Sequence, residues 1–82
     1  MTRVTLYTRP GCHLCDEARA RLEELRGGGR GFELAEVNIE EDERLHARYL
    51  ERIPVVEIGG RIVSELVLDE GAVRSELDTV AA

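Results

Sequence analysis

The only two cysteines of this 82-residue chain, Cys12 and Cys15, are separated by two residues and lie between two different hydrophobic patterns. Before them, over residues 2–8, apolar side chains alternate with polar ones, which is typical of a strand. After them, from Leu14 to Leu25, apolar side chains recur with helical spacing. A Cys-x-x-Cys pair at such a junction, with no other cysteine in the chain, predicts thiol–disulfide redox chemistry.

The first turn of a helix suits a nucleophilic sulfur, because its free N–H groups and partial positive charge stabilise a thiolate. We therefore expect a lowered pKa for Cys12, which would attack a substrate disulfide and form a mixed disulfide. Cys15 follows one helical turn later on the same face, where it can resolve that intermediate. These two catalytic residues would then form the redox-active disulfide.

Two neighbouring basic side chains are expected to tune the pKa of Cys12. Arg9 lies just upstream of the motif, and His13 lies between the two cysteines. A positive charge at either position would stabilise a nearby thiolate. For His13, a solvent-exposed side chain with a small electrostatic effect is an equally good interpretation.

Other roles for a cysteine pair are less well supported. A structural zinc site needs about four ligands, and the chain adds only His13 inside the motif and His46 far from it. We therefore predict no metal site. A structural disulfide across so short a loop would constrain the unfolded chain little. An inert core pair fits poorly, because Cys12 follows the turn-forming residues Pro10 and Gly11.

Length and charge set further bounds. Eighty-two residues predict a single domain, residues 1–82. A hydrophobic content of 43% and a charged content of 34% predict a soluble monomer, and no apolar run is long enough to cross a membrane. The net charge of −6 argues against binding to nucleic acid or to an anionic membrane. The first residues have no signal-peptide pattern, so we expect a cytoplasmic protein, where thiols are kept reduced.

Hydrophobic periodicity and turn residues predict seven elements in the order β-α-β-α-β-β-α. The strands are expected at residues 2–8, 32–39, 55–58 and 61–68, and the helices at 12–26, 40–51 and after Asp69. The glycine-rich segment 27–31 closes a helix rather than opening one, so it is interpreted as a C-cap and linker and not as a phosphate-binding loop. Gly59-Gly60 is expected to form a two-residue hairpin turn.

The same periodicity predicts which helical side chains pack inward. The first helix should bury an apolar stripe of Leu14, Ala18, Leu22 and Leu25. The second should pack Leu45, Tyr49 and Leu50. The third, with Asp69 as its N-cap, carries Ala72, Val73, Leu77 and Val80.

This element order, the strand-to-helix Cys-x-x-Cys and the Ile53-Pro54 pair before the hairpin resemble the glutaredoxins and the wider thioredoxin fold along essentially the whole chain. The resemblance implies an α/β thioredoxin-like fold with a mixed four-stranded sheet flanked by helices. It also implies a thiol–disulfide oxidoreductase that takes part in electron transport. Residues 8–15 resemble the active-site loop of the family, with Arg9 in the usual basic position.

Ile53-Pro54 resembles the cis-proline motif of the same family. The resemblance implies that Pro54 lies opposite the cysteines and that the backbone of Ile53 pairs with the substrate. Arg9, Ile53 and Pro54 are therefore the expected substrate-binding residues. An ordinary trans proline at the start of a strand is the alternative, because an X-Pro bond permits the cis form without requiring it.

Two departures from the family pattern concern the reductant. Glutaredoxins have Pro-Tyr or Gly-Tyr between their cysteines, whereas this chain has His13-Leu14. Glutaredoxins also grip glutathione with a Gly-Gly and acidic residues where the last helix begins. Here Gly59-Gly60 falls in the hairpin, and only Asp69 and Glu70 stand near that helix. The resemblance therefore leaves glutathione or another low-molecular-weight thiol as the candidate reductant, with no cofactor bound.

Two functions fit the sequence. The first is a small dithiol oxidoreductase that reduces a disulfide-containing protein or small molecule, with a thiol or a reductase as electron donor. The second is a thioredoxin-fold binding module, or an iron–sulfur cluster carrier, with little turnover. Cluster-carrying glutaredoxins often keep a single active-site cysteine, so the retained Cys15 counts against the second function.

Overall fold

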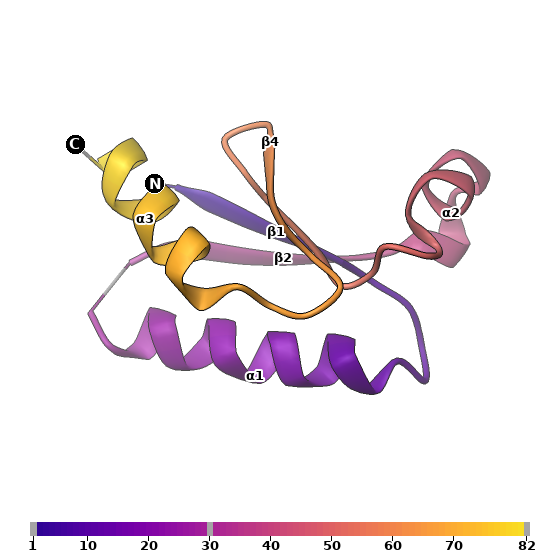
Figure 1. Ribbon diagram of the computed structural model, residues 1–82, viewed down its shortest axis with the longest axis horizontal. Coiled ribbons are helices and arrows are strands. Elements are labelled where there is room, and N and C mark those ends of the chain that lie inside the picture. Colours follow the sequence, from indigo (N-terminus) through magenta and orange to yellow (C-terminus); the bar gives the residue numbers. More distant parts are fainter. Residues whose placement is uncertain (1, 30, 82) are drawn as a thin grey trace.

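A computed structural model describes residues 2–29 and 31–81 of the chain. Its elements are β1 (Arg3–Thr8), α1 (His13–Gly27), β2 (Glu33–Asn38), the 3₁₀ turn η1 (Ile39–Glu41), α2 (Glu43–Tyr49), β3 (Val55–Ile58), β4 (Arg61–Glu65) and α3 (Glu70–Ala81). The strands form one sheet in the order β2-β1-β3-β4 (Figure 1). β1 pairs parallel with β2 and antiparallel with β3, and β3 pairs antiparallel with β4. The predicted element order and mixed four-stranded sheet are confirmed.

The main core lies between one face of the sheet and the two longer helices. β1 contributes Val4 and Leu6, which alternate along the strand and are fully buried. α1 and α3 cover them with a cluster that the other strands complete: Ala18, Leu22, Phe32, Val56, Ile58, Val73 and Leu77. Figure 1 shows α1 running along the length of β1 and β2, with α2 lying beyond the carboxyl end of β2. The carboxyl end of β1 therefore points to the region where α1 begins and α2 lies.

The buried stripe of α1 differs at its start from the one predicted. Cys15, Ala18 and Leu22 are buried, and Leu25 is partly buried, whereas Leu14 is 45% exposed. Leu14 precedes Cys15 by one residue, which turns its side chain about 100° around the helix. The inward face is therefore continued by the second cysteine, and the prediction that Leu14 begins the stripe is wrong.

The second helix is shorter than predicted, because two side chains cap the chain separately. The amide oxygen Oδ1 of Asn38 accepts the N–H of Glu40 at 2.9 Å and opens η1. A carboxylate oxygen of Asp42 accepts the N–H of Arg44 at 2.8 Å and opens α2. Of the acidic run predicted to begin the helix, Glu40 and Glu41 therefore lie in the 3₁₀ turn, whereas Asp42 and Glu43 do open α2. Leu50 follows α2 and is 37% exposed instead of packed.

Turn residues set the other boundaries. Gly59 and Gly60 adopt φ values of 59° and 82° and form the predicted hairpin turn. β4 ends at Glu65 rather than at residue 68, because Leu66 has a φ of 63° and leaves the extended conformation. Asp69 then caps α3 as predicted, accepting the N–H of Ala72 at 3.0 Å. At the C-terminal end of α1, the N–H of Gly28 bonds to the carbonyls of Glu24 and Leu25, which confirms the predicted C-cap. Residue 30, in the predicted linker, lies outside the described residues.

Two leucine substitutions on α1 test this assignment of its faces. Leu22→Ala should lower the free energy of unfolding by about 2–5 kcal/mol, because it opens a cavity in the core. Leu14→Ala should change the free energy of unfolding by no more than about 0.5 kcal/mol, because the side chain is largely exposed. Urea unfolding of both variants measures the difference. Equal costs at the two positions would contradict the structure.

Candidate active site

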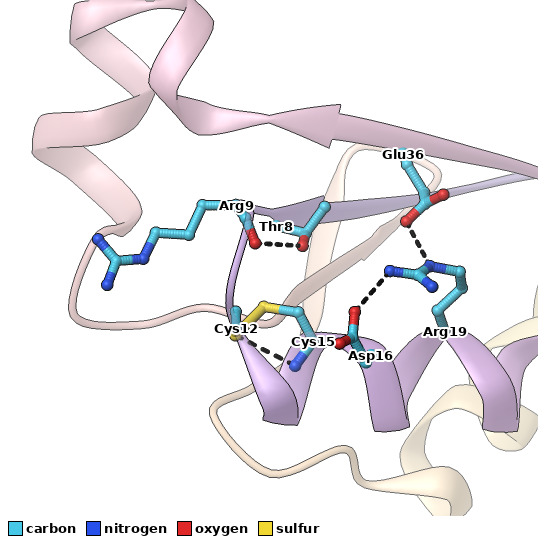
Figure 2. Close-up of polar contacts among 7 residues, drawn as sticks. All are labelled: Thr8, Arg9, Cys12, Cys15, Asp16, Arg19 and Glu36. Atoms are coloured by element: carbon cyan, nitrogen blue, oxygen red, sulfur yellow. Dashed lines mark hydrogen bonds and ion pairs between the residues drawn. A yellow bond between two sulfur atoms is a disulfide. The ribbon is translucent and has the colours of Figure 1, made fainter.

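The two cysteines lie at the start of α1 and form a disulfide (Figure 2). Cys12 is the N-cap residue, with extended backbone angles, and the Cα atoms of the pair are 5.2 Å apart. The N–H of Cys15 donates to Cys12 Sγ at 3.1 Å. Cys12 is partly exposed, whereas Cys15 is fully buried. The pair is therefore asymmetric, with one sulfur at the surface and one beneath it.

The local sequence explains how the chain reaches this geometry. β1 ends at Thr8, and Pro10 and Gly11 form a turn before the helix. Gly11 has a φ of 80°, in the left-handed region that glycine adopts without a steric penalty. The turn brings the chain back so that Cys12 caps the first free N–H groups of α1, in the way that an N-cap side chain normally does.

A second, smaller apolar cluster surrounds the buried cysteine. It consists of Cys15, Ile39, Tyr49, Ile53 and Val55, and Tyr7, Cys12 and Leu45 pack against it. The Ile53-Pro54 bond is cis, as predicted, and Pro54 is buried directly after Ile53. The fold therefore brings Ile53 into the same cluster as both cysteines. Ile39 and Tyr49 were not among the predicted site residues. The parallel pairing of β1 with β2 is the signal that could have placed Ile39 there.

Two tyrosine rings extend this cluster toward the surface. The rings of Tyr7 and Tyr49 have centroids 4.6 Å apart. The hydroxyl of Tyr7 donates to Glu57 Oε1 at 3.0 Å. Burial raises the pKa of Tyr7 to about 12, and the hydrogen bond and the negative charge of Glu57 act in the same direction. Tyr7 therefore stays protonated at neutral pH and holds one side of the cluster.

Arg52 connects the segment before Pro54 to the end of β4. Its guanidinium forms an ion pair with Glu65 and lies 5.3 Å from the centroid of the Tyr49 ring. Its carbonyl oxygen accepts the N–H of Leu66 at 2.9 Å. These contacts hold the backbone that leads into the cis bond from two directions. Sequence reasoning missed Arg52, which stands next to the Ile53-Pro54 pair without a motif of its own.

The basic residues predicted beside the cysteines take up exposed positions. In Figure 2 the side chain of Arg9 extends away from the two sulfur atoms. His13 begins α1 and is also exposed. The structure places both beside Cys12 in the chain, and their influence on its thiol stays a prediction.

A network of charged side chains follows the cysteine motif along α1. Arg19 donates to Asp16 and to Glu36, each at 2.7 Å, and so links the first turn of α1 to β2 (Figure 2). The hydrogen bond to Glu36, followed by the one to Asp16, raises the pKa of Arg19 above its usual value. The pairing balances the carboxylate that directly follows Cys15. Nothing in the sequence spacing alone identified this network.

Residues 2–29 and 31–81 contain neither a metal-binding cluster nor a helix that could span a membrane. No group of three or more His, Cys, Asp or Glu side chains in these ranges is arranged to hold a metal ion. No helix among the described residues is long and apolar enough to cross a membrane.

The sheet order, the cysteine pair at the start of the helix that follows β1 and the cis-proline before β3 define a protein of the thioredoxin-fold class. Residues 3–78 match the model of the glutaredoxin-like domain (DUF836) family. The chain therefore belongs to the glutaredoxin-like family within the thioredoxin superfamily. This membership, together with the disulfide-bonded Cys-x-x-Cys pair, supports a redox function.

Solved structures agree with this assignment. Protein Ne2328 from Nitrosomonas europaea is 31% identical, with a TM-score of 0.81 over 92% of this chain and 89% of its own. Protein XcR50 from X. campestris is 35% identical, with a TM-score of 0.73 over 93% of this chain and 96% of its own. A mutant thioredoxin from Halobacterium salinarum, 20% identical, has a TM-score of 0.66 over 95% of this chain and 73% of its own, and it shows the fold alone. No curated protein matches the chain.

The Tyr7–Glu57 contact predicts a pH dependence of stability. Because folding raises the pKa of Tyr7 from 10.0 to about 12, the protonated hydroxyl is favoured in the folded state. The resulting stabilisation should be complete below pH 10 and should disappear as the pH rises through about 12. Tyr7→Phe removes this titration while keeping the ring.

Unfolding free energies measured by urea titration between neutral pH and pH 12 compare the two proteins. Below pH 10 the variant should be less stable by about 1 kcal/mol, the worth of one hydrogen bond. The gap should close at high pH. A constant gap over the whole range would contradict this account.

Proposed function

We propose that the protein is a small dithiol oxidoreductase that reduces disulfides through Cys12 and Cys15. The observation that carries the proposal is the asymmetric pair at the N-terminus of α1. Cys12 caps the helix and is partly exposed, whereas Cys15 is fully buried. An attacking sulfur must reach its substrate, and a resolving sulfur needs to reach only its partner. The exposure of the two residues supports this division of roles.

In the first step the reduced protein offers Cys12 as a thiolate. The N–H of Cys15, 3.1 Å from Cys12 Sγ in the disulfide form, and the partial positive charge of the helix end would stabilise that anion. The thiolate attacks one sulfur of the substrate disulfide. A bond forms between Cys12 Sγ and that sulfur while the substrate S–S bond breaks. The departing sulfur leaves with the electron pair and takes a proton from water.

In the second step Cys15 loses its proton and attacks Cys12 Sγ. The intramolecular disulfide forms, the mixed disulfide breaks, and the second substrate sulfur leaves as a thiolate that is then protonated. The substrate gains two electrons and two protons, and the protein ends as the disulfide. The Cα separation of 5.2 Å allows the pair to close in this way.

The cis-proline segment is the proposed substrate-binding edge. Ile53 shares its apolar cluster with both cysteines, which supports a role for its backbone in pairing with the substrate. Arg52 holds this segment through Glu65 and through the N–H of Leu66. In this proposal Arg52 is a positioning residue, and Arg9 is a basic contact for the part of the substrate that lies on the side of α2.

An external electron donor must return the disulfide to the dithiol, and we propose a low-molecular-weight thiol or a reductase. Glutathione is expected to bind more weakly than in a typical glutaredoxin. Asp69 is occupied in capping α3, and Glu70 forms ion pairs with Arg21 and Arg74. Asp69 and Glu70 are the acidic residues at the start of α3, where a glutaredoxin would bind glutathione. We also propose that the protein acts in the cytoplasm, where thiols are kept reduced, and that it is a monomer.

Serine substitutions test the order of the two steps. Cys12→Ser should abolish reduction of a disulfide substrate, because no attacking thiolate remains. Cys15→Ser should trap a mixed disulfide on Cys12, because the resolving thiol is absent. Mass spectrometry of each reduced variant mixed with the substrate identifies the adduct. Each variant is the control for the other, and circular dichroism confirms that both are folded. An adduct on Cys15 in the Cys12→Ser variant would reverse the assignment.

A further inference from the structure

An open hollow of about 840 Å³ lies between α1 and the segment that joins β4 to α3. Its most exposed apolar side chains are Leu14, at 45%, and Val67, at 71%, and the rest of its apolar lining comes from Ala18, Ala20 and Leu68. Leu14 stands between the two cysteines in the chain. The hollow therefore begins beside the redox motif and extends away from it along α1.

Carboxylates dominate the charge around this hollow. Glu17, Glu24, Asp69 and Glu70 line it together with a single basic residue, Arg21. These side chains give the lining a net charge of −3.

Among the described residues, some of these carboxylates already form ion pairs with an arginine, and others do not. Arg21 pairs with Glu24 at 3.4 Å and with Glu70 at 3.8 Å. Glu17 is exposed and, within the part of the chain that the structure describes, has no ion-pair partner. The uncompensated negative charge is therefore concentrated next to the apolar end of the hollow.

We propose that this hollow binds the polypeptide segment beside the substrate cysteine and selects segments that combine an apolar side chain with Arg or Lys. The inference rests on the proposed function, because it names the class of substrate for the same cysteine pair. The apolar side chain would cover Leu14 and Val67, and the basic side chain would meet Glu17. A ligand with a net negative charge, such as glutathione with its two carboxylates and one ammonium group, would be repelled at this position.

The dimensions of the hollow limit what it holds. From Leu14 to Glu24 the helix advances about 15 Å. An extended chain covers that distance with about four or five residues. The occupant is therefore a short segment next to the disulfide, and the acidic rim sets its preferred charge.

The test compares two peptides that share the same apolar residues and carry either two arginines or two glutamates. The single cysteine of each is held in a mixed disulfide with 2-mercaptoethanol. Pre-reduced protein is mixed with each peptide, and the rate constant of protein oxidation is measured in a single turnover. Bis(2-hydroxyethyl) disulfide, which is neutral and too small to fill the hollow, serves as the reference substrate.

The arginine peptide should react about fivefold faster than the glutamate peptide, as exposed ion pairs allow. Glu17→Arg should abolish this preference. Glu33→Arg makes the same charge change at the start of β2, outside the hollow, and should retain it. Val67→Ser should slow both peptides about threefold through lost apolar contact and leave the reference substrate unaffected.

A binding measurement separates this inference from the proposed function. The same peptides with serine in place of cysteine are titrated into the protein, and the methyl NMR signals of Leu14 and Val67 are followed. The arginine peptide should shift these signals, and the glutamate peptide and glutathione should not. If bis(2-hydroxyethyl) disulfide is not reduced, the proposed function is wrong. The NMR titration still shows whether the hollow binds the arginine peptide. Equal shifts with all three ligands, or none with the arginine peptide, would overturn the inference.

Discussion

Packing of one face of α1 against β1 determines where both cysteines lie. Ala18 and Leu22 hold that face against the sheet, and Cys15 continues it into a second apolar cluster. Cys12, as the N-cap residue, then remains at the surface, in hydrogen-bonding distance of the N–H of Cys15. A single rotational setting of the helix thus produces one accessible sulfur and one buried sulfur.

The same setting gives the site two chemically different sides. On the side of α2, Arg48 and Arg52 lie against the ring of Tyr49 beside the cis-proline segment. On the side of α3, Leu14 and the acidic residues of the hollow face solvent. Charge in this chain of net −6 is therefore unevenly distributed around the motif. A substrate that spans Cys12 would meet two guanidinium groups on one side, that of Arg52 being paired with Glu65, and the carboxylates of the hollow on the other.

Much of this architecture could be predicted from the sequence, because the strongest signals are local. The Cys-x-x-Cys junction, the Gly59-Gly60 turn and the Asp69 cap all lie where their patterns indicate. The predictions were wrong where tertiary packing determines which side chain is buried, or where a backbone angle determines where a strand ends. The helical periodicity of apolar residues placed Leu14 in the buried stripe. Periodicity alone does not show that the neighbouring Cys15 side chain is the one that faces the core. The end of β4 depends on the positive φ of Leu66, an apolar residue for which sequence gives no such signal.

In the reduced, folded protein Cys12 should be an activated thiol and Cys15 a shielded one. Alkylation of the reduced protein with iodoacetamide over a range of pH, read by mass spectrometry, tests this expectation most directly. Cys12 should react first, with an apparent pKa below the ordinary value of about 8.5, while Cys15 should be protected. Reaction of both cysteines at the same rate and with an ordinary pKa, or of neither, would contradict it.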